Sequence, residues 1–79
     1  MATIGKNIRV ATIFEPGGTI RPVWFELNRQ KYTISRTVYR WAERLGASTL
    51  LHFAVSDEAN LFELTYNTGE QTWQVSSIQ

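Results

Sequence analysis

Hydrophobic and polar residues alternate along most of this chain with the period of two that is typical of β-strands. The alternation is clearest over residues 21–41, which predict two long strands folded back on each other. Val23 and Phe25 share one face of the first strand, and Tyr32 and Ile34 continue the apolar set after a turn. Directly opposed residues of an antiparallel pair share a face, so the loop between these strands must have an even length.

Two loop lengths satisfy this condition. A two-residue turn at Asn28-Arg29 pairs Phe25 with Tyr32, whereas a four-residue loop pairs Leu27 with Tyr32. Asparagine tolerates a positive φ angle well and arginine does not, so a tight turn carries some strain here. We favour the two-residue turn and keep the four-residue loop as the alternative.

The alternation loses its phase after Ile34. A β-bulge between Ser35 and Val38 would bend the second strand and return Trp41 to the core. A long strand with a kink is what a small rolled sheet or barrel needs in order to close. The stretch around residues 21–41 is therefore expected to organise the fold.

Four further stretches have strand character, namely residues 8–14, 49–55, 61–66 and 73–75. Between them, Glu15-Pro-Gly-Gly18 predicts a type II turn with a glycine at its third position. The break at residues 43–48 predicts a loop at Gly46, preceded by a single helical turn over residues 42–45. The expected core residues of these later strands are Leu51, Phe53, Val55, Phe62, Leu64, Tyr66, Trp73 and Val75.

The elements together predict an all-β fold. About six strands joined by short turns form an antiparallel meander, and rolling into a small barrel covers the face that an open sheet would expose. The alternative to closure is that a second copy covers this face or edge, which would give a homodimer. At 79 residues, we expect a single domain over residues 1–79.

Composition narrows the classes of protein. Of the residues, 43% are hydrophobic and 13% aromatic, which suits a compact core of bulky rings. Cysteine is absent, so disulfides and thiolate metal sites are excluded. Residues 1–10 contain no apolar run long enough for a signal peptide or a membrane span, and we expect a cytoplasmic protein that does not bind membranes.

Charge is unevenly distributed although the net charge is only +1. All eight lysines and arginines precede Leu45, and with three glutamates they give this part a net charge of +5. The remainder carries four carboxylates and a net charge of −4. The asymmetry points either to an acidic partner or to basic strands that lie beside acidic ones in one sheet, and we favour the second interpretation.

Candidates for catalysis are few. The only histidine, His52, lies between Leu51 and Phe53 and is expected to face solvent on the other side of the strand. Ser56 and Asp57 are close in sequence, but neighbouring residues of a strand point to opposite faces. The Asp57-Glu58 turn lacks the spacing of a calcium loop. We therefore expect no catalytic residue, no metal ligand and no cofactor.

The most informative surface signal is the mixture of basic and aromatic residues between positions 24 and 44. Its candidate binding residues are Trp24, Lys31, Arg36, Tyr39 and Arg40. Rings that stack on unpaired bases, beside cations that meet phosphates, are typical of small barrels that bind single strands. The aromatic motif of RNA-recognition domains is missing, however. A protein interface with the same aromatic anchors is the other interpretation.

From Pro22 onward, aromatic, aliphatic and turn residues follow one another in a characteristic order, at Pro22, Phe25, Tyr32, Ile34, Trp41, Glu43, Phe53, Val55, Glu63-Leu64, Thr68-Gly69 and Trp73. This order and spacing resemble the pattern of a family of small bacterial domains of unknown function, over about three quarters of the chain. The chain departs from the family pattern at Leu27 and Arg29, where an aromatic residue and a turn glycine are usual. Members of this family are often linked to Y-family translesion polymerases, which implies a DNA-related setting. The resemblance identifies no catalytic residue. Relatives usually have polar residues at the positions of Trp24 and Tyr39, which implies that these two rings face a partner.

We expect a non-enzymatic protein-interaction module that is able to self-associate as a homodimer. The alternative hypothesis is an accessory protein that binds single-stranded nucleic acid in DNA repair.

Overall fold

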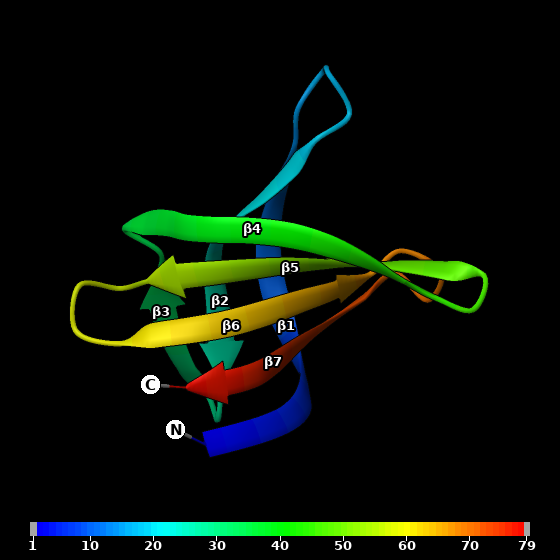
Figure 1. Ribbon diagram of the computed structural model, residues 1–79. Helices are drawn as coiled ribbons and strands as arrows, with labels where there is room; N and C mark the ends of the chain where they lie inside the picture. Colours follow the sequence, from blue (N-terminus) through cyan, green and yellow to red (C-terminus); the bar gives the residue numbers. More distant parts are fainter. Residues whose placement is uncertain (1, 79) are drawn as a thin grey trace.

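The computed structural model describes residues 2–78, with side chains from residue 6 onward. It is an antiparallel sheet of seven strands, without a helix in the described residues, and the strand order is β3-β2-β1-β7-β6-β5-β4. Strands that follow each other in the chain are neighbours except for β3 and β4, and β1 and β7 also pair (Figure 1). The strands are β1 (Ala2–Phe14), β2 (Ile20–Leu27), β3 (Gln30–Thr33), β4 (Arg36–Leu45), β5 (Ser48–Ser56), β6 (Leu61–Asn67) and β7 (Thr72–Ile78).

The sheet curls into a half-barrel because β1 belongs to both of its halves. The first part of β1 pairs with β7 and the second part pairs with β2, and both ladders contain a register shift that bends the strand. Figure 1 shows β1, β2 and β3 crossing behind the layer of β4 to β7. Among the described residues no ladder joins β3 to β4, so these two strands are the edges of the curled sheet. The predicted all-β meander that rolls up is confirmed, with seven strands in place of about six.

The β2–β3 hairpin has the register predicted for the two-residue turn. Phe25 pairs with Tyr32, and Glu26 pairs with Lys31. The turn residues Asn28 and Arg29 have φ angles of 54° and 68°, so both adopt the left-handed conformation that a type I′ turn requires. The right-handed twist of the strands is thus accommodated although Arg29 is poorly suited to this conformation.

The predicted second long strand is in fact two strands on opposite edges of the sheet. After β3 the amide of Ile34 still donates to the carbonyl of Val23 at 3.0 Å, but the amide of Ser35 donates to the carbonyl of Ser56 at 2.8 Å, at the end of β5. The chain therefore passes from the β2 side to the β5 side within two residues. The predicted bulge exists, as a register shift between Thr37 and Tyr39.

Two other local predictions were wrong. The expected helical turn over residues 42–45 is instead the end of β4, which continues to Leu45 before the turn at Gly46 (φ 62°). In the Glu15–Gly18 turn the positive φ angle of 95° is at Gly18 and not at Gly17, so the turn is not type II. The amide of Glu15 donates to the carbonyl of Thr19, which makes this a three-residue hairpin loop closed by a left-handed glycine.

The core lies inside the curl, on the side that we call the concave face. Phe25, Phe53, Val55, Leu64 and Val75 are almost completely buried and come from both halves of the sheet. The ring of Phe25 stacks on Tyr32 at a centroid distance of 5.1 Å and meets Phe62 edge-on at 5.0 Å. The core includes Phe25, Phe53, Val55, Phe62, Leu64, Trp73 and Val75 as predicted, and Leu51 and Tyr66 pack against it while partly buried. The prediction that Val23 belongs to the core was wrong, because the ladder between β1 and β2 shifts register at this position.

Residues 2–78 include no helix long and apolar enough to cross a membrane.

Candidate functional site

Strand β4 is the most exposed element of the molecule. Each of its ten residues is exposed, and in the described part of the chain its only ladder partner is β5. Its exposed hydrophobic side chains are Val38, Tyr39, Trp41 and Leu45. An edge strand presents unpaired backbone N–H and C=O groups, and here large apolar side chains accompany them.

Two aromatic rings of β4 lie on the outer, convex face of the sheet. Tyr39 pairs with Ala54 and Trp41 pairs with His52, so all four side chains share this face. The Tyr39 ring stacks on Trp41 at 5.4 Å, and Trp41 stacks on His52 at 4.9 Å with an interplanar angle of 10°. The expectation that Trp41 returns to the core was wrong, because β4 runs along the opposite edge and its register places Trp41 outside, 37% exposed.

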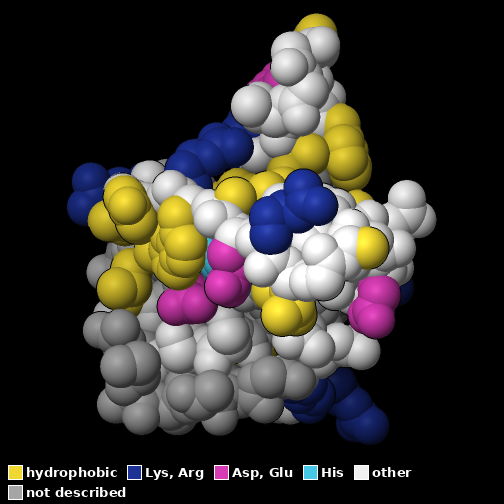
Figure 2. Space-filling model, turned by 45° about the vertical axis from the view of Figure 1, so that its right-hand side comes forward, with side chains coloured by type: hydrophobic (Ala, Val, Ile, Leu, Met, Phe, Trp, Pro, Cys, Tyr) yellow, Lys and Arg dark blue, Asp and Glu magenta, His cyan; other side chains and the backbone are white. Residues whose placement is uncertain are grey.

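His52 is buried, with 8% of its surface exposed, and does not face solvent as predicted. Its Nε2 lies 2.7 Å from a carboxylate oxygen of Glu43, and its Nδ1 lies 3.0 Å from the hydroxyl of Thr65. The Thr65 hydroxyl in turn lies 3.1 Å from that of Ser76, which donates to the carbonyl and the carboxylate of Glu63. Figure 2 shows the imidazole as a small cyan patch between acidic and hydrophobic side chains.

This polar chain joins β4 to β7 through one histidine. If the ring is neutral, Nε2 donates to Glu43 and the Thr65 hydroxyl donates to Nδ1. If the ring carries two protons, Nδ1 donates to Thr65, which donates to Ser76, which donates to Glu63. Both arrangements leave no buried side-chain polar atom unpaired among the described residues.

A carboxylate, an imidazole and a hydroxyl in sequence are also the parts of a nucleophilic triad. However, the Thr65 hydroxyl is buried in the middle of β6, where backbone N–H groups are occupied by the ladders to β5 and β7. An acyl-transfer site needs free N–H donors beside its nucleophile. The geometry therefore favours a network that fixes the position of Trp41 and of β4. In residues 2–78 no three His, Cys, Asp or Glu side chains are placed to hold a metal ion.

Arg40 connects β4 to the other half of the molecule on the concave face. It pairs with Phe53, its guanidinium lies 5.3 Å from the centre of the Phe53 ring, and its Nη2 donates to the carbonyl of Ile20 in β2 at 3.3 Å. The side chain thus crosses the gap between the edge β4 and the start of β2.

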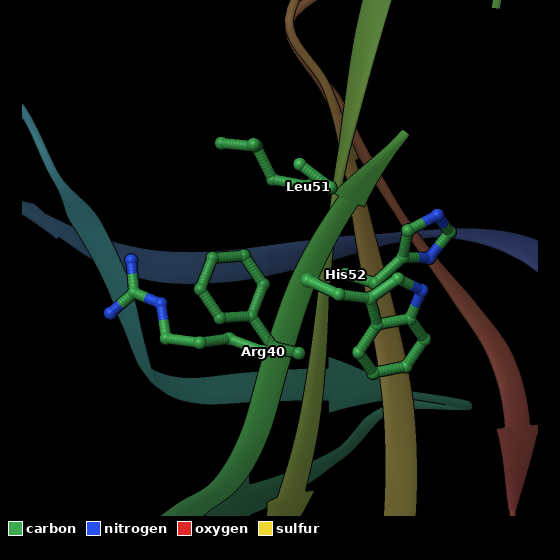
Figure 3. Close-up of a pocket in the computed structure, with 6 residues that line it drawn as sticks. Arg40, Leu51 and His52 are labelled. Atoms are coloured by element: carbon green, nitrogen blue, oxygen red, sulfur yellow. The ribbon is translucent and has the colours of Figure 1, made fainter. Parts of the chain in front are cut away.

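A hollow of about 230 Å³ lies beside Arg40. It is lined by Arg40, Trp41, Ala42, Leu51, His52 and Phe53. Figure 3 shows Arg40 and Leu51 pointing to one side of the β4–β5 pair and His52 to the other. Because Ala42 pairs with Leu51, its small side chain leaves space between larger neighbours on the concave face.

A second hollow of about 230 Å³ lies on the convex face, and five of the seven residues that line it have polar side chains. It is lined by Leu45, Leu50, Thr65, Asn67, Glu70, Thr72 and Gln74.

The five predicted binding residues do not form one cluster. Trp24 lies on β2, with the ammonium of Lys31 above its ring at 4.7 Å. Arg36, Tyr39 and Arg40 lie on β4, and Tyr39 and Arg40 occupy opposite faces of that strand. The structure thus separates the predicted surface into a β2–β3 part and a β4 part.

Sequence reasoning missed the contact between Glu43 and His52. A two-residue turn at Gly46-Ala47 pairs Leu45 with Ser48 and therefore Trp41 with His52. Gly46 is the sequence signal for this turn and register, with which the helical turn predicted over residues 42–45 is incompatible.

The chain matches none of the protein-family models, curated proteins or solved structures with which we compared it. The resemblance to small bacterial domains therefore stays a prediction.

Proposed function

We propose that this protein is a non-enzymatic interaction module that binds a protein partner along the free edge of β4. The observation that carries the proposal is the exposure of all ten residues of this edge strand, including Tyr39 and Trp41. Addition of a partner strand to a sheet edge gains main-chain hydrogen bonds, and side chains on alternate positions provide selectivity. The lack of cysteine agrees with a cytoplasmic setting for such a module.

The aromatic pair supplies the apolar part of the contact. Tyr39 is 64% exposed although it is stacked on Trp41, so one side of the stack is open to a partner. Tryptophan and tyrosine are the residues most often found at the energetic centre of interfaces. Since Trp41 is already held against His52, little side-chain freedom is lost when a partner covers it.

Site-specific photo-crosslinking in a host cell tests the proposal. A photoreactive phenylalanine analogue at Tyr39 is expected to give covalent adducts with protein, which mass spectrometry identifies. The same analogue at Trp24, in the other half of the sheet, is the matched control and is expected to give few. Adducts that are absent at Tyr39, or equal at both positions, would contradict the proposal.

A second candidate function rests on a different observation. The Lys31 ammonium lies 4.7 Å from the centre of the Trp24 ring, and a second cation, Arg29, is exposed at the turn of the same hairpin. We propose binding of single-stranded nucleic acid on this β2–β3 surface as the alternative, which the resemblance to polymerase-linked domains also supports.

Fluorescence titration with short single-stranded DNA at two salt concentrations tests this alternative. Binding should weaken steeply with salt and be lost in Trp24→Ala, while Tyr39→Ala should bind as the unmodified protein does. Binding that is insensitive to salt or to Trp24→Ala would contradict it.

A further inference from the structure

We propose that the occupant of the β4 edge is an extended peptide segment of another protein, with the pattern acidic–x–large apolar–x–acidic. The inference rests on the proposed function of β4 and adds the chemical class of the partner. The faces and charges of β4 determine the pattern.

The charges of β4 favour an acidic partner. The strand carries Arg36, Arg40 and Arg44 against Glu43, a net charge of +2. Arg40 pairs with Phe53 and Arg44 pairs with Thr49, so both project to the concave face. The Arg40 guanidinium has five N–H groups and donates one of them to the carbonyl of Ile20, so others can donate to a partner's carboxylate. Acidic side chains four positions apart on an added strand would lie opposite these two arginines.

Between the two arginines, Ala42 leaves the concave-face hollow open. An added strand has one side chain opposite Ala42, midway between its two acidic positions and on the same face. The hollow is lined there by Leu51 and Phe53 and has a volume of about 230 Å³, several times the ~30 Å³ that one water molecule occupies. The space beside Leu51, which Figure 3 shows on the same side of the strands as Arg40, is thus large enough for a leucine side chain at the middle position.

The convex face determines the positions in between. One of these side chains lies opposite Trp41 and the other opposite Glu43, and a β-branched or aromatic residue packs well against the Trp41 ring. On the far side of the sheet, the β1–β2 hairpin rises past β4 (Figure 1) and carries Phe14, 68% exposed. One added strand therefore meets apolar surface on both of its faces.

A second copy of the chain fits this edge less well than a peptide does. Antiparallel pairing of two β4 strands doubles the charge to about +4 along one seam. The β1–β2 hairpin projects beyond β4 (Figure 1), so in such a pair the hairpins of both copies would crowd the space beside the joined strands. Self-association is thus an outcome that the test must detect.

The test uses the peptide Thr-Val-Glu-Val-Leu-Val-Glu-Val-Thr and the complete protein. Binding is followed by tryptophan fluorescence, and hydrogen exchange of backbone amides locates it. We expect protection of amides in β4 and not in β3. A peptide with both glutamates replaced by lysine should bind about tenfold more weakly or worse, and replacing the central leucine by serine should also weaken binding.

Charge reversal in the protein makes the test specific. Arg40→Glu with Arg44→Glu should reverse the preference, so that the lysine peptide binds better than the glutamate peptide. Arg29→Glu, which changes a cation in the β2–β3 turn, is the matched control and should leave the preference unchanged. Retained preference for the glutamate peptide in the double variant would overturn the proposal.

Light scattering over a range of protein concentrations separates this inference from the proposed function. A dimer whose β4 amides are protected without peptide would overturn the peptide occupant but leave β4 as an interaction edge. Failure of peptide binding together with adducts at Tyr39 would also overturn only the peptide pattern. If the peptide does not bind and Tyr39 also gives no adducts, the proposed function is contradicted as well.

Discussion

Strands β2 and β4 are of similar length and both mix apolar with basic residues, but they have opposite environments. β2 has a neighbour on each side, and its Phe25 is completely buried at the centre of the core. β4 has one neighbour, and none of its residues is buried. An alternating pattern thus shows that a segment is a strand, whereas the position of the strand in the sheet decides whether its apolar side chains are core or contact surface.

The two strands also differ in what their aromatic residues touch. Phe25 packs against both Tyr32 and Phe62, which come from different halves of the sheet and also contact each other. Tyr39 touches Trp41 of its own strand and is otherwise open. Removing the Phe25 ring should lower the free energy of unfolding, whereas removing the Tyr39 ring should mainly weaken the binding of a partner.

The largest expected effect is that of Phe25→Ala. Truncation of a buried phenylalanine costs about 3–5 kcal/mol of unfolding free energy, a large part of the roughly 5–15 kcal/mol available to a small domain. Tyr39→Ala on β4 should change the same quantity by only about 0.5 kcal/mol. Urea denaturation followed by circular dichroism measures both. Similar losses in the two variants would show that β4 is packed much more tightly than its exposure indicates.

A smaller effect is expected for Arg40→Met, which tests the link between the two strands. Methionine keeps an apolar stem over Phe53 but loses the hydrogen bond to Ile20 that spans the gap, at a cost of about 1 kcal/mol in unfolding free energy. Arg44→Met removes the same charge from the same face of β4 and is the control. Equal effects of the two changes would mean that charge, and not the contact across the gap, stabilises the edge.

The smallest expected effect is a gain of stability in Arg29→Gly. Arg29 has a φ angle of 68°, which glycine adopts without strain, so the change should raise the unfolding free energy by about 0.5–1 kcal/mol. Arg29→Ala removes the same charge but keeps the strain and should give no gain. Thermal denaturation of the glycine and alanine variants measures the difference. A glycine variant that is less stable than the unmodified protein would contradict the conclusion that Arg29 is strained in this turn.

Much of the fold was predictable from the sequence because it depends on local pattern. The period of two and the even loop length together predict the pairing of Phe25 with Tyr32, which the structure confirms. The same reasoning correctly places Phe53, Leu64 and Val75 on one face. These features need only the geometry of a strand and its nearest turn.

The candidate site was less predictable because it depends on which strands become neighbours. The sequence names Tyr39 and Arg40 as exposed, but the alternation alone does not show that the chain leaves β2 at Ser35 and joins β5. That crossing puts Trp41 on the convex face and lets its ring cover His52, which was expected to face solvent.

By itself, the sequence determines that this protein is made of β-strands, where most of them turn, and which side chains share a face. Only the tertiary structure decides that β4 is an open edge, that Glu43 meets His52, and that Arg40 spans the gap to β2. The physical reason is that alternation and turn chemistry act over a few residues. Curling of the sheet, by contrast, depends on burying the apolar faces of both halves against each other, which no single segment encodes.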